Sequence, residues 1–69
     1  MYIEVSTDNS TLLYKGVVYF FEFICSGEKP KIKIYLDRSR VAETIKLKKD
    51  YVVDIMNYED GKLIGQIIV

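Results

Sequence analysis

Histidine is absent from the 69-residue chain, and cysteine occurs once, at Cys25. Without histidine there is no histidine-based catalytic triad and no histidine general base near neutral pH. One cysteine allows no internal disulfide and, without histidine, no ordinary zinc site. At the end of an apolar segment, Cys25 is expected to be a buried, unreactive thiol. The chain therefore predicts no enzyme, no catalytic residue, no metal and no cofactor.

Long apolar runs are also missing from the sequence. The longest extends from Val17 to Phe21, far short of the roughly 20 residues that a membrane-spanning helix needs. The chain also lacks a basic segment followed by an apolar stretch and a cleavage site of small residues. Together with the single cysteine, these features predict a soluble cytoplasmic protein without a membrane partner. Nothing in the pattern indicates a small-molecule substrate.

Apolar residues are plentiful, at 49% of the chain, which is too many for a disordered polypeptide. A chain this short forms one domain, here residues 1–69, close to the lower limit for a self-sufficient core. One small layer of sheet does not easily cover so much apolar surface. We therefore expect the protein to self-associate, most simply as a homodimer.

Alternating apolar residues and turn signals predict a mostly β protein. Residues 7–10 carry turn chemistry, and Asp60-Gly61 favours a type I′ hairpin, in which both central residues have positive φ. Lys15-Gly16 marks either a hairpin or a bulge, Gly65 marks a bulge or a close approach, and residues 26–30 form a loop. Strands are expected over residues 2–6, 11–14, 17–25, 31–36, 51–58 and 63–69.

The period of the apolar residues changes after position 37. Val41 and Ile45 recur at helical spacing, and Asp37 or Ser39 can cap the start of a helix. We therefore expect one short helix near residues 39–46. The predicted fold is a small antiparallel barrel or sandwich of five to six strands with this single helix.

Positive charge is concentrated in the middle third of an otherwise neutral chain. Residues 29–49 hold eight basic residues against two acidic ones, a net charge of plus six. Residues 1–28 and residues 50–69 each hold one lysine against four carboxylates, a net charge of minus three in each segment. A localised positive field attracts polyanions even when the total charge is zero.

Alternation in residues 31–36 sends Ile32, Ile34 and Leu36 to the core, so the residues between them share the opposite face. Lysines and a phenol on one face can contact phosphates and a base or sugar, and arginines in the following turn can reach phosphates or guanine edges. The alternative is that these charges are solvated or paired within the molecule. The predicted nucleic-acid-binding residues are Lys31, Lys33, Tyr35, Arg38, Arg40, Lys46 and Lys48.

The segment from Val17 to Cys25 is apolar on both faces apart from Glu22. One face belongs to the core, and the other, with Val18, Phe20 and Ile24, is expected to form the interface of an oligomer. The alternative is that Tyr19 or Phe20 stacks on nucleic-acid bases.

Residues 31–69 resemble the AbrB/MazE-type DNA-binding hairpin module of transition-state regulators and antitoxins. An alternating strand at 32–36, Leu47-Lys48-Lys49-Asp50 and Asp60-Gly61-Lys62 carry the resemblance, although Lys49 replaces the family's usual glycine. The resemblance implies an interlocked homodimer, with a helix over residues 38–45 and basic residues presented to DNA.

Two functions follow from the sequence. The first is a small, non-catalytic nucleic-acid-binding β protein, for DNA more than for RNA, such as a transcription regulator or an antitoxin-like protein. The second is a protein-interaction or assembly module, in which the segment 17–25 forms the contact and the basic segment is solvated or faces a partner.

Overall fold

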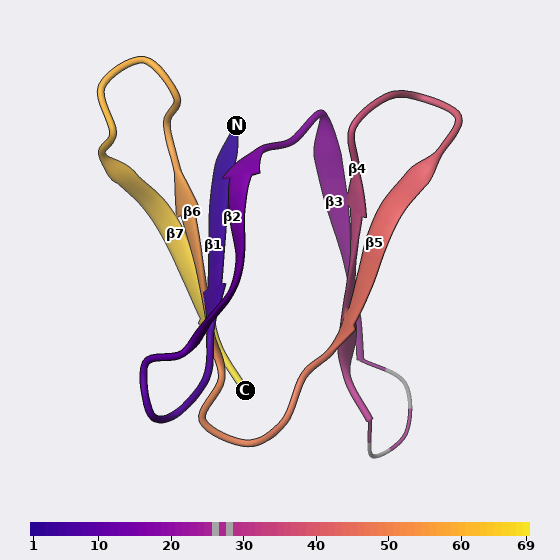
Figure 1. Ribbon diagram of the computed structural model, residues 1–69, viewed down its shortest axis with the longest axis vertical. Coiled ribbons are helices and arrows are strands. Elements are labelled where there is room, and N and C mark those ends of the chain that lie inside the picture. The colour runs from indigo at the N-terminus through magenta and orange to yellow at the C-terminus, as the bar shows by residue number, and fades with distance from the viewer. Residues whose placement is uncertain (26, 28) are drawn as a thin grey trace.

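The computed structural model describes residues 1–25, 27 and 29–69, which form seven strands in two antiparallel sheets (Figure 1). The described residues include no helix. One sheet has four strands in the order β2-β1-β6-β7, and the other has three in the order β3-β4-β5. The strands are β1 (Tyr2–Ser6), β2 (Leu12–Val17), β3 (Phe20–Ile24), β4 (Lys31–Tyr35), β5 (Val41–Lys46), β6 (Val52–Met56) and β7 (Leu63–Ile68).

The chain crosses between the sheets twice, at opposite ends of the molecule (Figure 1). The first crossing runs through Val18 and Tyr19, whose amides donate to the carbonyls of Met1 at 2.9 Å and Tyr35 at 2.8 Å. The second follows β5, where the amide of Leu47 donates to the carbonyl of Pro30 at 2.9 Å. The chain then returns to the first sheet, where β6 pairs with β1 on one side and with β7 on the other.

The core lies between the two sheets and is entirely aliphatic. Strands β1, β4, β5 and β6 supply its buried strand residues, all of them β-branched, which suit a half-buried pleated surface. No polar or charged side chain is buried among the described residues, so the side chains that can meet a charged ligand lie on the surface. The buried residues are Ile3, Val5, Val18, Ile32, Ile34, Ile45, Leu47 and Val53.

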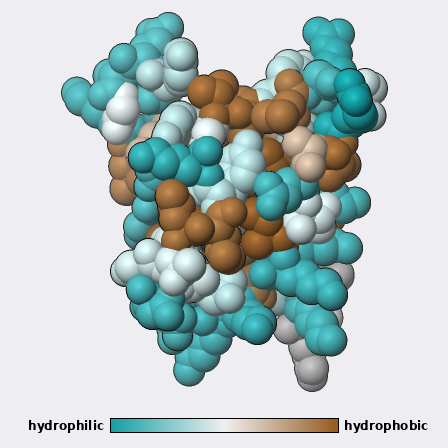
Figure 2. Space-filling view, viewed as in Figure 1, coloured by the Kyte–Doolittle hydropathy of each residue, from teal (hydrophilic) through white to brown (hydrophobic). Residues whose placement is uncertain are grey.

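The surface distribution follows from this arrangement. Figure 2 shows hydrophobic side chains gathered in the middle of one face, between the two sheets, and hydrophilic side chains at the ends where the turns lie. No helix of the described residues is long and apolar enough to cross a membrane.

The mostly β, antiparallel prediction is confirmed, and the two sheets face each other instead of closing into a barrel. The predicted helix near residues 39–46 is wrong, because Val41–Lys46 forms strand β5 and pairs with β4. Val41, Thr44 and Ile45 are β-branched, and β4 offers them an unpaired edge.

The prediction of one strand over residues 17–25 is also wrong. Val17 ends β2 in one sheet, and Phe20 begins β3 in the other. Between them, Val18 is only 3% exposed and belongs to the core. At the far end of β4, Leu36 is 57% exposed, against the prediction that it faces inward, because the strand ends at Tyr35.

Two turns lie where the sequence predicts them, but the type of the second turn differs from the prediction. Residues 7–10 form the β1–β2 turn, with the amide of Thr7 donating to the carbonyl of Thr11 at 2.9 Å. The β6–β7 hairpin is present, but only Gly61 of its turn has positive φ, so it is not type I′. The register shift between β6 and β7 lies beside Gly65, as the bulge alternative predicted.

Two further predictions concern loops. Lys15-Gly16 is neither a hairpin nor a bulge, because both residues lie in β2 in regular register with Glu4 and Ile3. The loop predicted over residues 26–30 falls partly on positions 26 and 28, which lie outside the described residues.

Candidate nucleic-acid interface

The outer face of the three-stranded sheet carries a group of lysines and aromatic rings, and we call it the basic face. Because Ile32 and Ile34 point into the core, their neighbours in β4 point outward. The register brings one residue of β3 beside each of them and one residue of β5 beside each lysine. The basic face consists of Phe20, Glu22 and Ile24 in β3, Lys31, Lys33 and Tyr35 in β4, and Thr44 and Lys46 in β5.

Two lysines of the basic face are direct cross-strand neighbours. Lys31 of β4 lies opposite Lys46 of β5, and Lys33 is one row further along β4. Side chains opposite each other in an antiparallel pair have Cβ atoms about 5 Å apart, and like charges at this spacing destabilise the sheet. Among the described residues, none of these lysines forms an ion pair. An anion between them would relieve the repulsion.

The other end of the basic face is aromatic. The rings of Phe20 and Tyr35 are stacked, with centroids 4.2 Å apart and an interplanar angle of 5°. Tyr19 meets Phe20 edge to face, with ring centroids 5.7 Å apart, and Tyr19 as a whole residue is 51% exposed. The guanidinium Nε of Arg38 donates to the Tyr19 hydroxyl at 3.1 Å, which brings a cationic residue of the middle third beside these rings.

Glu22 is the one carboxylate among the strand residues of the basic face. It lies opposite Lys33 and accepts a hydrogen bond of 2.5 Å from the Tyr35 hydroxyl. This hydrogen bond, followed by partial burial and the negative charge of Glu22, raises the pKa of Tyr35 above its ordinary value. Tyr35 is therefore held as a neutral phenol whose ring is fixed against Phe20.

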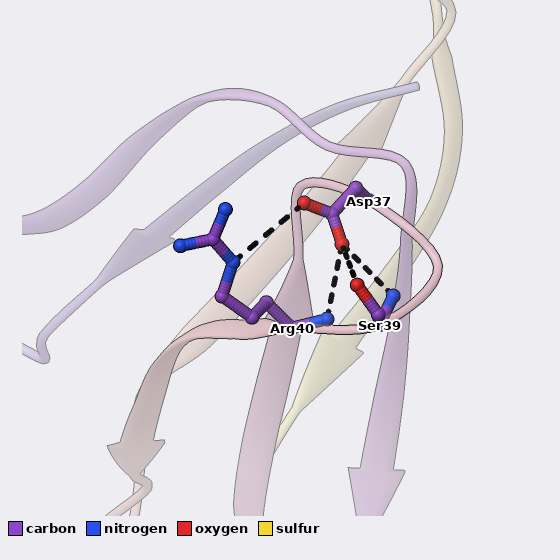
Figure 3. A network of polar contacts seen from close by, with 3 residues as sticks. All are labelled: Asp37, Ser39 and Arg40. Atoms are coloured by element: carbon purple, nitrogen blue, oxygen red, sulfur yellow. Dashed lines mark hydrogen bonds and ion pairs between the residues drawn. The ribbon is translucent and has the colours of Figure 1, made fainter.

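The loop between β4 and β5 is organised by Asp37 (Figure 3). One carboxylate oxygen, Oδ1, accepts the amides of Ser39 at 2.8 Å and Arg40 at 3.0 Å, together with the Ser39 hydroxyl at 3.0 Å. The backbone and side-chain hydrogen bonds from Ser39, joined by the Arg40 amide, lower the pKa of Asp37. The guanidinium Nε of Arg40 lies 4.0 Å from the other oxygen, Oδ2. Arg38, between these anchored residues, is left to reach Tyr19.

A lysine-lined cleft of about 540 Å³ lies where the chain leaves β5. Its apolar lining comes from Pro30, Leu47 and Val69, and the backbone bond from Leu47 to Pro30 ties two sides of it together. Lys46 reaches both the cleft and the basic face, so the two positive regions are continuous. The lysines of the cleft are Lys29, Lys46, Lys48 and Lys49.

The structure brings together most of the residues singled out from the sequence. Lys31, Lys33, Tyr35 and Lys46 share the basic face, and Arg38 joins its aromatic end. The other two lie elsewhere: Lys48 lines the adjoining cleft, and Arg40 is turned toward Asp37.

The predicted interface residues do not lie on one surface. On the basic face, Phe20 lies beside Tyr35 and Ile24 beside Lys31, whereas Val18 is buried in the core and cannot form an interface. Sequence reasoning missed Lys29 and Lys49 as parts of one cleft, because only the fold brings the ends of β5 and β7 together. The lysines at 29, 48 and 49 were themselves visible in the charge pattern.

Cys25 is exposed, against the prediction of a buried thiol, because strand β3 ends one residue earlier, at Ile24. Within residues 1–25, 27 and 29–69, no group of three or more acidic or cysteine side chains is placed to hold a metal ion.

Comparison of the chain with models of protein families, with curated protein sequences and with solved structures finds no match. The helix implied by the AbrB/MazE resemblance is a loop and strand β5 in this structure.

Proposed function

We propose that this protein binds single-stranded nucleic acid on the basic face and catalyses no reaction. Lys31, Lys33 and Lys46 would contact successive phosphates, and bases would stack on the exposed aromatic rings at the other end of the same face. Single strands are bound in this way by sheets that combine a positive surface with aromatic side chains. We propose DNA as the first ligand to test.

The observation that carries this proposal is the direct opposition of Lys31 and Lys46 on the surface that also presents Tyr19 and Phe20. A solvated surface has no need to set two lysines opposite each other, where they repel. The chain as a whole is neutral, so the attraction is local and should be strongly screened by salt.

The test is the salt dependence of binding to a labelled mixed-sequence DNA strand, measured by fluorescence anisotropy. Three phosphate contacts predict that log affinity falls with log salt with a slope of about −2 between about 50 and about 200 mM salt. Lys31→Glu should weaken binding about tenfold at the lower concentration and reduce the slope by about 0.7. Lys62→Glu, the same charge change in the β6–β7 turn, is the matched control and should bind as the wild type does.

The stability of the Lys31→Glu variant shows whether weaker binding comes from misfolding. The new carboxylate faces Lys46, so the variant should be more stable than the wild type by about 0.5 kcal/mol, the scale of one cross-strand pair. Weaker binding by a more stable protein cannot come from unfolding. The proposal fails if the wild type does not bind at low salt, or if Lys62→Glu weakens binding as much as Lys31→Glu.

An acidic protein surface is the second partner that the basic face could accept, in line with the assembly module. The aromatic end distinguishes the two partners. Tyr19→Ala should weaken nucleic-acid binding because a base loses a stacking partner worth about 1–3 kcal/mol. The affinity for a partner held only by charge would change little.

A further inference from the structure

Strand β7 differs from the other six strands because it contains no ionisable side chain. It is also an edge strand of the four-stranded sheet. The remaining three edges, β2, β3 and β5, carry Lys15, Glu22 and Glu43 respectively. Charged residues on an edge strand oppose pairing with another chain, so β7 alone lacks this protection.

The side chains along β7 are apolar and largely uncovered. Leu63, Ile64 and Ile68 are 57%, 64% and 65% exposed, so a neighbouring strand would cover part of each side chain. The one polar side chain is that of Gln66, whose amide nitrogen donates to a carboxylate oxygen of Asp54 at 2.7 Å. Adding a strand at this edge therefore buries no charged side chain of β7.

The backbone of β7 has hydrogen-bonding groups to offer. The amide of Val69 donates to the carbonyl of Tyr51 at 3.0 Å, toward β6. In an antiparallel ladder, alternate residues bond to opposite sides, so Ile67 and Gly65 also face β6. The N–H and C=O groups of Gln66 and Ile68 then point away from the sheet, to the open edge.

We infer that β7 pairs with β7 of a second copy of this chain, in antiparallel orientation about a two-fold axis at Gln66. The two Gln66 residues would exchange backbone hydrogen bonds across the axis, and Ile68 would lie opposite Ile64 of the second copy. A two-fold interface must be complementary to itself. This register places apolar side chains opposite apolar side chains and no charge opposite a like charge.

This pairing would join the two four-stranded sheets into one continuous sheet of eight strands. The two-fold axis of an antiparallel pair stands perpendicular to the sheet, so each face continues across the junction. Both three-stranded sheets would therefore lie on the same side of the eight-stranded sheet, with their basic faces directed the same way. A single pair of strands buries less than the roughly 1,600 Å² of a typical stable interface, so the dimer should depend on concentration.

The first test is the molar mass of the full chain by sedimentation equilibrium from about 1 to about 300 µM, where a weak dimer forms. We expect the wild type to approach twice the monomer mass, and Ile64→Lys to remain monomeric. Leu13→Lys, which adds the same charge to edge strand β2, is the matched control and should still dimerise. A monomeric wild type throughout this range, or equal dissociation by Leu13→Lys, would overturn the inference.

The second test locates the axis with engineered disulfides in a Cys25→Ser background. Residues paired across the axis have Cα atoms about 5.5 Å apart, within disulfide range. Gln66→Cys should therefore form a covalent dimer under mild oxidation. Ile68→Cys should not, because its own copy would lie about four residues away along the strand. Faster cross-linking at position 68 than at position 66 would refute the proposed register.

Discussion

At the residue scale, Glu22 decides how much positive charge the basic face presents. It lies between the lysine end and the aromatic end, opposite Lys33 and bonded to the Tyr35 hydroxyl. The same carboxylate therefore reduces the field of the lysines and fixes an aromatic ring. The two effects can be measured separately in one variant.

Glu22→Gln should bind nucleic acid more tightly than the wild type, by up to about fivefold, because it removes about 1 kcal/mol of opposing charge. The pKa of Tyr35 should fall toward its ordinary value, because the acceptor loses its charge. NMR titration of the tyrosine rings measures the pKa, and anisotropy measures the affinity. Weaker binding by Glu22→Gln would mean that the glutamate itself contacts the ligand.

Asp37 predicts a pH dependence of stability. Its folded pKa lies below the ordinary value near 3.8, so its contribution to stability is complete above that pH and is lost as the pH falls through the folded pKa. Asp37→Asn should therefore melt below the wild type at pH 7, and the two should converge at low pH, where the wild-type carboxyl is also protonated. Thermal melts across this range test the expectation.

A matched variant separates the donors around Asp37. Ser39→Ala removes the hydroxyl but keeps the backbone amides, so it should show only part of the Asp37→Asn effect. A constant difference in melting temperature between Asp37→Asn and the wild type at every pH would contradict an electrostatic origin.

At the element scale, the sequence pattern predicts strand β4 well and the segments around it poorly. Lys31–Tyr35 alternates over its whole length, and the structure confirms which face each residue takes. Val41 and Ile45 are four residues apart and fit one face of a helix or one face of a strand equally well. Strand β5 forms because β4 is beside it, which a local pattern does not report.

The crossings between the sheets could not be predicted either, because they too depend on which strands lie side by side. Val17 and Phe20 are both apolar, but they belong to different sheets, and the bend at Val18 and Tyr19 leaves no polar residue to mark it. Four members of the basic face could be predicted as neighbours because they follow from alternation in β4 and the charge pattern. The placement of Phe20 beside them could not be predicted from the sequence, because it depends on the β3–β4 register.

Two glycines near β7 should respond in opposite ways to an added methyl group. Gly61 has φ +68°, so Gly61→Ala should destabilise the protein by about 1 kcal/mol even though space is open around it. Gly65 does not have positive φ, and a Cβ there would lie 3.9 Å from the Ile55 side chain, an ordinary contact. Gly65→Ala should therefore be neutral or slightly stabilising. Urea unfolding compares the pair, and equal losses would contradict this reading.

At the scale of the whole molecule, the proposed dimer and the proposed ligand are linked by geometry. Two basic faces directed to the same side could bind one long strand together, whereas each could bind a short strand alone. The second contact of a long strand is then intramolecular, and its effective concentration raises the overall affinity without any new interaction.

Strand length should therefore reveal the dimer. A strand of about 6 nucleotides fits one face, and a strand of about 24 can reach two, given site sizes of about 4–16 nucleotides. In the wild type the longer strand should bind about a hundredfold more tightly. Ile64→Lys should lose most of this advantage while keeping its affinity for the short strand. Because the new lysine adds positive charge, a loss of affinity for the long strand cannot be electrostatic. If Ile64→Lys keeps the full advantage, the two faces do not act together.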